Sequence, residues 1–171
     1  MHRRNLPHTS DPAIRALDRN AITRSLFILP ETYRLTINYD NAFSTMVRTC
    51  KCEFIHQNIK QMRYTLPRTG KQTFTTRLIR CTSDSPTGEV LRGITLSGFY
   101  PATVEQLVAF CTNHPDFQRK HPILALGSTL NVGGHPFVVY ASGSVMKRFI
   151  SLNTGSHMEW SQVCRFLVAE P

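Results

Sequence analysis

Cys50, Cys52 and His56 lie close together in the sequence, and Cys81 follows further along the chain. Thiolates and imidazoles are the ligands of structural zinc sites, but those sites usually combine two closely spaced pairs of ligands. Here the single C-x-C has no second matching pair. The five cysteines are odd in number and unevenly spaced, unlike the even sets of secreted disulfide frameworks. We therefore expect reduced, mostly buried thiols, with no metal ion and no other cofactor.

Nucleophilic and phosphate-cradling chemistry also lacks its usual patterns. Ser128, Ser142 and Ser144 lie beside glycines, but no G-x-S-x-G nucleophile elbow is present. The Gly133-Gly134 pair belongs to no Walker loop and no dinucleotide fingerprint. Among the 11 Asp and Glu residues, no two share an evident apolar site where one carboxyl could act as an acid and the other as a base. The sequence predicts that the protein is not an enzyme.

The strongest chemical signal is an uneven positive charge. The 171 residues carry 20 Lys and Arg against 11 Asp and Glu, a formal net charge of +9 at pH 7. Residues 1–80 hold 14 of the basic and 5 of the acidic residues, whereas residues 81–171 hold 6 of each. A basic region attracts polyanions, because Lys and Arg replace the counterions condensed on phosphates. Solubility alone would also explain a basic protein, but the asymmetry favours nucleic-acid binding.

Aromatic residues are interleaved with the basic residues of the first half, as on surfaces where bases stack and phosphates are neutralised. Phe54 and Tyr64 are such aromatics, although both would equally suit a core. No recognition-helix or zinc-finger pattern is present, so RNA or another single strand is favoured over duplex DNA. The residues predicted to bind nucleic acid are Arg3, Arg4, Arg15, Arg19, Arg24, Arg48, Lys51, Lys60, Arg63, Tyr64, Arg68, Lys71, Arg77 and Arg80.

These residues need a folded domain to position them, and the length and composition indicate one. A hydrophobic content of 41% is ordinary for a globular protein, and 171 residues can bury a core. Residues 1–30 contain Pro7, Pro12 and Pro30, and they predict a basic and possibly flexible arm with a short helix from about Ser10 to Asn20. Residues 31–171 are expected to form a single α+β domain.

Apolar periodicity in the first half predicts two strands around one helix. Alternation over residues 33–39 and 73–81 is typical of half-buried strands. Between them, Asp40-Asn41 is expected to cap a helix whose apolar residues recur at i, i+3, i+4 and i+7. Residues 51–72 have no clear assignment, apart from a turn marked by Pro67 and Gly70. The buried positions of that helix are predicted to be Phe43, Met46, Val47 and Cys50.

The second half predicts two helices followed by strands. Ser85-Pro86 is expected to start one helix and Gly98 to end it. Thr103 and Gln106 form the capping box of a second helix that ends before Pro115. Strands are then expected over residues 123–126, 137–140, 145–152 and 164–169, the last closing the sheet. The predicted fold class is α+β, a small mixed or antiparallel sheet with about three helices and a C-terminal β-meander.

Part of this second half resembles a recurring bacterial and phage sequence pattern. FYPATVEQLVAF at residues 99–110 and PILALGS at residues 122–128 match a PAT…EL…F helix that leads into P(I/V)xALGS. Trp160 and the segment RFLV at residues 165–168 are similar to its W…RFLAV ending. The resemblance covers most of residues 39–171. It implies the layout of the domain, including a helix over residues 85–98, and it implies no activity.

In size, charge and β-α-β-α order, the chain is also similar to the small basic RNA-binding proteins of nucleus-forming jumbo phages, the chimallin C group. That resemblance implies RNA binding. It is not accompanied by a G-x-x-G clamp of the KH type, because the basic turn from Leu66 to Lys71 contains one glycine.

A protein-binding or inhibitor module is the alternative from another functional class. An exposed strand of the C-terminal sheet could pair with a partner, and an exposed Trp160 or Tyr140 would favour this function. No apolar run approaches the roughly 20 residues of a membrane helix, and the N-terminus shows no signal-peptide pattern. We therefore expect a cytoplasmic protein that binds nucleic acid, RNA favoured, that has a possible protein partner and that does not contact membranes.

Overall fold

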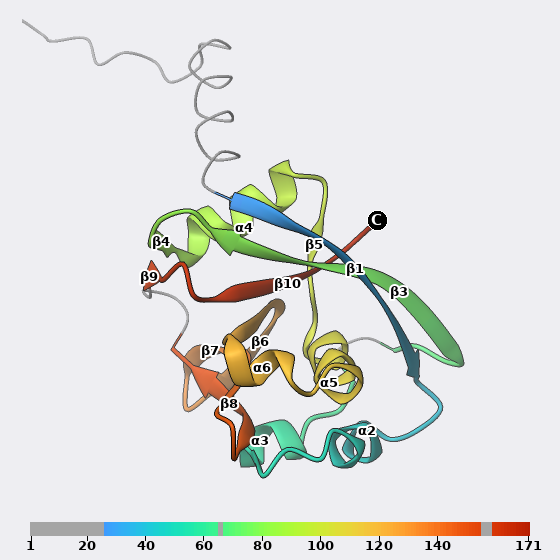
Figure 1. Cartoon of the computed structure of the whole chain (residues 1–171). Helices are drawn as coiled ribbons and strands as arrows, with labels where there is room; N and C mark the ends of the chain where they lie inside the picture. Colours follow the sequence, from blue (N-terminus) through green and yellow to red (C-terminus); the bar gives the residue numbers. More distant parts are fainter. Residues whose placement is uncertain (1–25, 65–66, 155–158) are drawn as a thin grey trace, which may run out of the picture.

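The computed structural model describes residues 26–64, 67–154 and 159–171, and these form an α+β fold (Figure 1). The main sheet has eight strands in the order β1-β3-β10-β6-β7-β8-β2, with β5 paired to β10, and β4 pairs with β9 separately. The strands are β1 (Leu26–Asn38), β2 (Phe54–Ile55), β3 (Lys71–Cys81), β4 (Ser85–Pro86), β5 (Tyr100–Pro101), β6 (Ile123–Val132), β7 (His135–Gly143), β8 (Arg148–Asn153), β9 (Glu159–Trp160) and β10 (Arg165–Ala169). The helices are α2 (Phe43–Thr49), α3 (Gln57–Lys60), α4 (Thr87–Leu96), α5 (Val104–Asn113) and α6 (Phe117–Lys120).

β1 and β3 form a long antiparallel ribbon. β1 follows the predicted alternation over residues 33–39, whereas in β3 the consecutive residues Leu78 and Ile79 are both fully buried, because a core lies on each face of the sheet there. Leu35 and Ile37 of β1 are buried on one face, while Arg34 and Thr36, which alternate with them, are exposed. β1 begins at Leu26, where it pairs with the end of β3, and its register shifts in the middle of the strand. Residues 26–30, which the sequence assigned to the arm, therefore belong to the sheet.

The C-terminal strand β10 lies in the middle of the sheet. β6, β7 and β8 form the predicted antiparallel meander, in which Gly133 and Gly134 make the first turn with φ angles of 61° and 85°. β8 begins at Arg148, so residues 145–147 belong to the second turn and not to the strand. β10 does not close the meander as expected from the sequence. It pairs antiparallel to β3 and parallel to β6, and it thereby joins the N-terminal ribbon to the meander.

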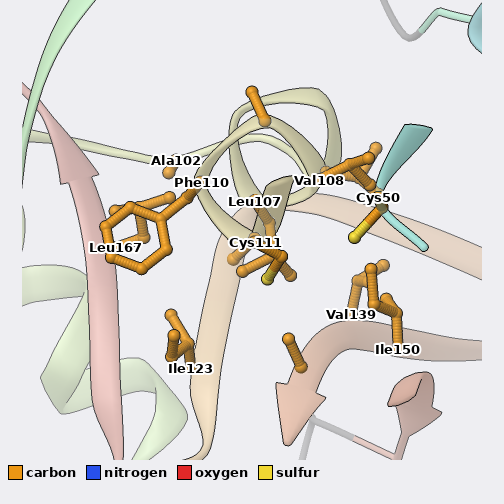
Figure 2. Packing of buried hydrophobic residues seen from close by; sticks show 14 of the residues in the cluster. Cys50, Ala102, Leu107, Val108, Phe110, Cys111, Ile123, Val139, Ile150 and Leu167 are labelled. Atoms are coloured by element: carbon orange, nitrogen blue, oxygen red, sulfur yellow. The ribbon is translucent and has the colours of Figure 1, made fainter. Parts of the chain in front are cut away.

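α5 packs on the face of the sheet that carries the larger core. It contacts the edge strand β1 as well as β6 and β7, and β3 and β10 lie between these in the strand order, so the sheet curves around this helix. Figure 2 shows Phe110 of α5 beside Leu167 of β10, and Val139 and Ile150 of the meander on the other side of the helix. α2 and α3 add Val47 and neighbouring apolar residues to the same core.

Consecutive residues of β10 point to opposite faces of the sheet, so the sheet carries a second core on its other face. α4 covers this second core. Val90 and Ile94 of α4 are buried in this second core, and Gly98 follows the helix with a φ of 82°, as expected for a helix stop. Ser85 does not cap α4 as predicted. Ser85 instead lies in β4, where it pairs with Trp160 of β9, and Pro86 occupies the N-cap position. Figure 1 shows α4 at one end of the molecule and α2 and α3 at the other.

The two helices that flank the larger core begin differently. The predicted capping box of Thr103 and Gln106 is present at the start of α5. The predicted cap of α2 is wrong, since Ala42 occupies the N-cap and makes no side-chain cap. Asp40 instead accepts a hydrogen bond of 2.7 Å from the backbone N–H of Gly70 and ties the start of β3 to the loop before α2.

Several short elements, α3, α6, β2, β5 and β9, were not predicted from the sequence. Each has two to four residues, too few for a periodic pattern to form. None of the helices described is long and apolar enough to cross a lipid bilayer.

Candidate nucleic-acid interface

Two adjoining grooves lie beside α2 and α3. The first, the Tyr64 groove, has a volume of about 610 Å³ and runs between residues 39–44 and residues 60–64. The second, the Lys51 groove, has a volume of about 340 Å³ and is lined by Ser44, Val47, Arg48, Lys51, Cys52, Glu53, Ile55 and Lys60. Ser44 and Lys60 line both grooves, so the two form one continuous surface, here called the α2–α3 grooves.

The rim of the α2–α3 grooves is basic. Arg48, Lys51, Lys60 and Arg63 line it, and all four are exposed. Within residues 26–64, 67–154 and 159–171, none of these four side chains forms an ion pair. Arg48 donates a hydrogen bond of 3.1 Å to the hydroxyl of Thr45, a neutral partner. Their charges therefore remain available to an anion.

Two acidic residues also line the grooves, and both already accept backbone hydrogen bonds. Glu53 Oε2 accepts the N–H of Arg148 at 2.6 Å, and this hydrogen bond holds the pKa of Glu53 below its ordinary value. Asp40 accepts the N–H of Gly70. Four basic side chains face two occupied carboxylates, so the surface is positive overall.

The floor of the α2–α3 grooves is apolar. Val47 and Ile55 are buried beneath the Lys51 groove, and Tyr39 and Phe43 are buried beneath the Tyr64 groove. Tyr64 belongs to this floor: its ring lies 4.9 Å from that of Tyr39 and 5.6 Å from that of Phe43, between centroids. Tyr64 is half-buried, so it offers only part of its ring to a base.

Lys51 occupies an unusual position on this rim. Its φ of 51° makes it the one non-glycine residue with a left-handed backbone among those described. Arg148, which is buried, holds the segment in place: its Nη2 donates to the carbonyl oxygens of Cys50 at 2.9 Å and of Lys51 at 2.6 Å. Its Nη1 donates to the carbonyl oxygen of Cys111 at the end of α5. Arg148 thus links the end of α5 to the segment that lines the Lys51 groove.

Arg148 was not among the predicted site residues. It belongs to the half of the chain with no net charge, and a single arginine at the start of a strand has no pattern that distinguishes a buried one from an exposed one.

Four further basic residues of the predicted interface lie on or next to the β1–β3 ribbon, and three of them already have partners. Arg68 lies over the rings of Tyr39 and Phe74, at 5.5 and 5.2 Å from their centroids. Arg77 donates to Glu170 at 2.8 Å, and Arg80 lies 5.0 Å from the ring centroid of Phe27. Lys71, at the start of β3, is exposed.

The predicted residues therefore do not form one face from Arg63 to Arg80. Arg77 and Arg80 are three residues apart in β3, so their side chains point to opposite sides of the sheet, and the charge of Arg77 is paired with Glu170. The five arginines predicted in the arm lie outside the described residues: Arg3, Arg4, Arg15, Arg19 and Arg24.

The thiols are free, and four of the five are buried. Cys50 Sγ and Cys52 Sγ lie 3.2 Å apart, and the hydrogen bond of Cys50 with Cys111 raises the pKa of Cys50 to about 12. His56, weighed above as a metal ligand, instead uses Nδ1 to accept the N–H of Asn58 at the start of α3. Cys81 belongs to the second core. No group of three or more His, Cys, Asp or Glu side chains in the described part of the chain could hold a metal ion.

Comparison with known protein families, with curated proteins and with solved structures finds no match to this chain.

Proposed function

We propose that the protein binds single-stranded nucleic acid, with RNA favoured, in the α2–α3 grooves. One observation carries this proposal: four exposed cations without acidic partners among the described residues surround an apolar floor. Phosphates require the first feature and unstacked bases the second. Because Lys60 lines both grooves, a strand could follow them without a break.

A single strand fits these dimensions better than a duplex. α2 has seven residues and α3 has four, so neither resembles a recognition helix that enters a major groove. Asn41 and Ser44 also line the Tyr64 groove and offer hydrogen-bonding groups to a ribose 2′-hydroxyl. These polar groups favour RNA over single-stranded DNA.

The alternative function, a protein-binding module, predicted that Trp160 or Tyr140 would be exposed, and neither side chain is. Trp160 is 5% exposed, and its indole N–H donates to the hydroxyl of Thr87 at 2.8 Å. Tyr140 is half-buried, with its ring 6.0 Å from that of Phe149.

The experiment is an anisotropy titration of labelled single-stranded RNA, single-stranded DNA and duplex DNA at salt concentrations between about 50 and 200 mM. The test variant is Lys51→Glu combined with Lys60→Glu. We expect it to weaken RNA binding more than tenfold. Two lost phosphate contacts should also reduce the slope of log affinity against log salt by about 1.4.

Arg92→Glu is the matched control for charge, because Arg92 is exposed on α4, away from α2 and α3 (Figure 1). It should bind RNA nearly as tightly as the wild type. Absence of binding by the wild type at low salt would refute the proposal, and a pull-down for a protein partner would follow. Equal losses in the groove variant and in the control would refute the assignment of the site.

A further inference from the structure

The turn between β7 and β8 presents two apolar side chains to solvent. Val145 is 87% exposed and Met146 is 79% exposed, the two largest values among the exposed large hydrophobic residues described. Tight turns usually carry Gly, Asn, Asp or Ser, whose backbone preferences and hydrogen bonds suit the bend. We call residues 144–147 the hairpin tip.

Several polar contacts hold the backbone of the hairpin tip. Its own backbone closes with a hydrogen bond of 2.7 Å from the N–H of Ser144 to the carbonyl oxygen of Lys147. From α6, Arg119 Nη1 donates to the carbonyl oxygens of both Ser144 and Val145. The buried amide of Gln118 donates to the carbonyl oxygens of Ser142 and Phe149, one on each strand of the hairpin.

These contacts leave the apolar side chains at a tip whose backbone is fixed. A rigid apolar contact loses little conformational entropy when it binds, which is the advantage of preorganisation.

The hairpin tip adjoins the Lys51 groove. Arg148, the residue directly after the tip, donates its backbone N–H to Glu53 and its guanidinium to the carbonyl oxygen of Lys51. Glu53 and Lys51 both line that groove. Arg148 therefore connects the hairpin tip directly to two residues that line the groove.

The charge around the hairpin tip is also positive. Lys147 is exposed in the tip itself, and Lys120 is exposed on α6. Of the two acidic residues nearby, Asp116 is paired with Arg119 at 3.5 Å, and Glu53 accepts the backbone N–H of Arg148. An apolar tip among cations is complementary to a polyanion that carries apolar faces, which describes a nucleic acid strand with unstacked bases.

We propose that Val145 and Met146 act as a wedge that inserts between neighbouring bases of the strand bound in the α2–α3 grooves. Apolar side chains that enter base steps in this way separate the stacked bases. This inference rests on the proposed function and extends it, since the grooves would hold the phosphates and the tip would hold two bases apart.

The experiment compares the wild type with Val145→Ser combined with Met146→Ser, using single-stranded RNA labelled at its end or carrying 2-aminopurine. We expect about a tenfold loss of affinity, similar to the loss of one stacked base. The salt dependence should be unchanged, because no phosphate contact is removed. Wild-type protein should raise the fluorescence of 2-aminopurine by unstacking it, and the variant should not.

Tyr100→Ser is the control for loss of an exposed apolar side chain, because Tyr100 is 62% exposed and lies in β5, outside the hairpin tip. It should behave as the wild type. Wild-type binding with a steep salt dependence, unaltered in the tip variant, would overturn the wedge and leave the proposed function standing. Absence of wild-type binding would overturn both.

Discussion

Lys51 shows how one residue of the proposed interface is strained and held in place. A left-handed backbone costs a non-glycine residue about 1–2 kcal/mol, because its Cβ approaches the following carbonyl oxygen. The hydrogen bonds from Arg148 to the carbonyl oxygens of Cys50 and Lys51 hold this conformation. Strained residues concentrate at functional sites, where the surrounding structure holds them. Here the strained residue carries one of the four cations of the α2–α3 grooves.

Lys51→Gly separates the charge of this residue from its conformation. Glycine adopts the left-handed region freely, so we expect the free energy of unfolding in urea to rise by about 1 kcal/mol. RNA binding should weaken, because a phosphate contact is lost. Lys60→Gly is the matched control: it removes a cation from the end of α3 and should lower stability by about 0.5–1 kcal/mol. A Lys51→Gly protein that is less stable than the wild type would contradict the strain assigned to this position.

The side chain of Arg148 stabilises the same segment by hydrogen bonds to its backbone. The side chain of Arg148 is buried, and Arg148→Met removes its hydrogen bonds to the carbonyl oxygens of Cys50, Lys51 and Cys111. Buried acceptors that lose a charged donor are costly, so we expect a loss of about 3 kcal/mol in the free energy of unfolding. Arg63→Met, at an exposed position, should change stability by less than about 0.5 kcal/mol. Similar urea midpoints for the two variants would contradict the supporting role of Arg148.

At the scale of elements, the start of α5 explains the sequence pattern in residues 99–128. Thr103 caps the helix, and the hydroxyl of Ser128 accepts the N–H of Val104 at 3.0 Å. Ser128 reaches the helix because β6 shifts register between Ala125 and Thr129. Gly127 allows that approach, since its N–H donates to the carbonyl oxygen of Ala102 at 2.9 Å. The motif therefore joins β6 to the start of α5.

Gly127→Ala tests this junction. An added Cβ would lie 2.8 Å from the carbonyl oxygen of Ala102 and closer still to that of Pro101, and neither backbone group can move freely. We expect a loss of about 1–3 kcal/mol in unfolding free energy, measured by urea or thermal denaturation. Gly88→Ala is the control, because a Cβ there, in α4, meets nothing within 4 Å. That variant should be neutral or stabilised by up to about 1 kcal/mol. Equal stability of the two variants would refute the close approach.

At the scale of the whole molecule, two histidines couple stability to pH. Burial lowers the pKa of His114, which packs 4.8 Å from the ring of Tyr33 and 4.9 Å from that of Phe110. Burial, with the charges of Arg165 and Lys120, also lowers the pKa of His121. Both histidines bind a proton less readily in the folded protein than in the unfolded chain, where the pKa is 6.5. Their contribution to stability is therefore fully present well above pH 6.5 and is lost as the pH falls through that value toward the folded pKa values.

We expect urea midpoints to decrease between about pH 7.5 and pH 5.5, a window that lies above the titration of ordinary carboxylates. His114→Phe keeps an aromatic ring against Tyr33 and Phe110 and cannot be protonated, so the decrease should be smaller in this variant. The remaining dependence would come from His121. An identical pH dependence in the wild type and in the variant would contradict the role of His114.

Much of the secondary structure was predictable from the sequence, because it depends on local patterns. The alternation in residues 33–39 and 73–81, the capping box at Thr103 and the glycine turn of the meander each involve residues close together along the chain. The α+β class follows from these elements. The shortest elements were not predictable, and neither was the central position of β10, because its pairing with β3 and β6 joins residues far apart in the sequence.

The sequence by itself determined that the first half of the chain is basic, and the tertiary structure decided where each of those charges lies and which side chains it contacts. Arg68, Arg77 and Arg80 contribute to the basic composition of the first half just as Arg48 and Arg63 do. In the folded protein, however, they lie against aromatic rings or a carboxylate. Glu170, the partner of Arg77, lies 93 residues away along the chain. Charge is a property of a residue type, whereas pairing and burial depend on long-range contacts, so the grooves beside α2 and α3 and the hairpin tip exist only in the folded protein.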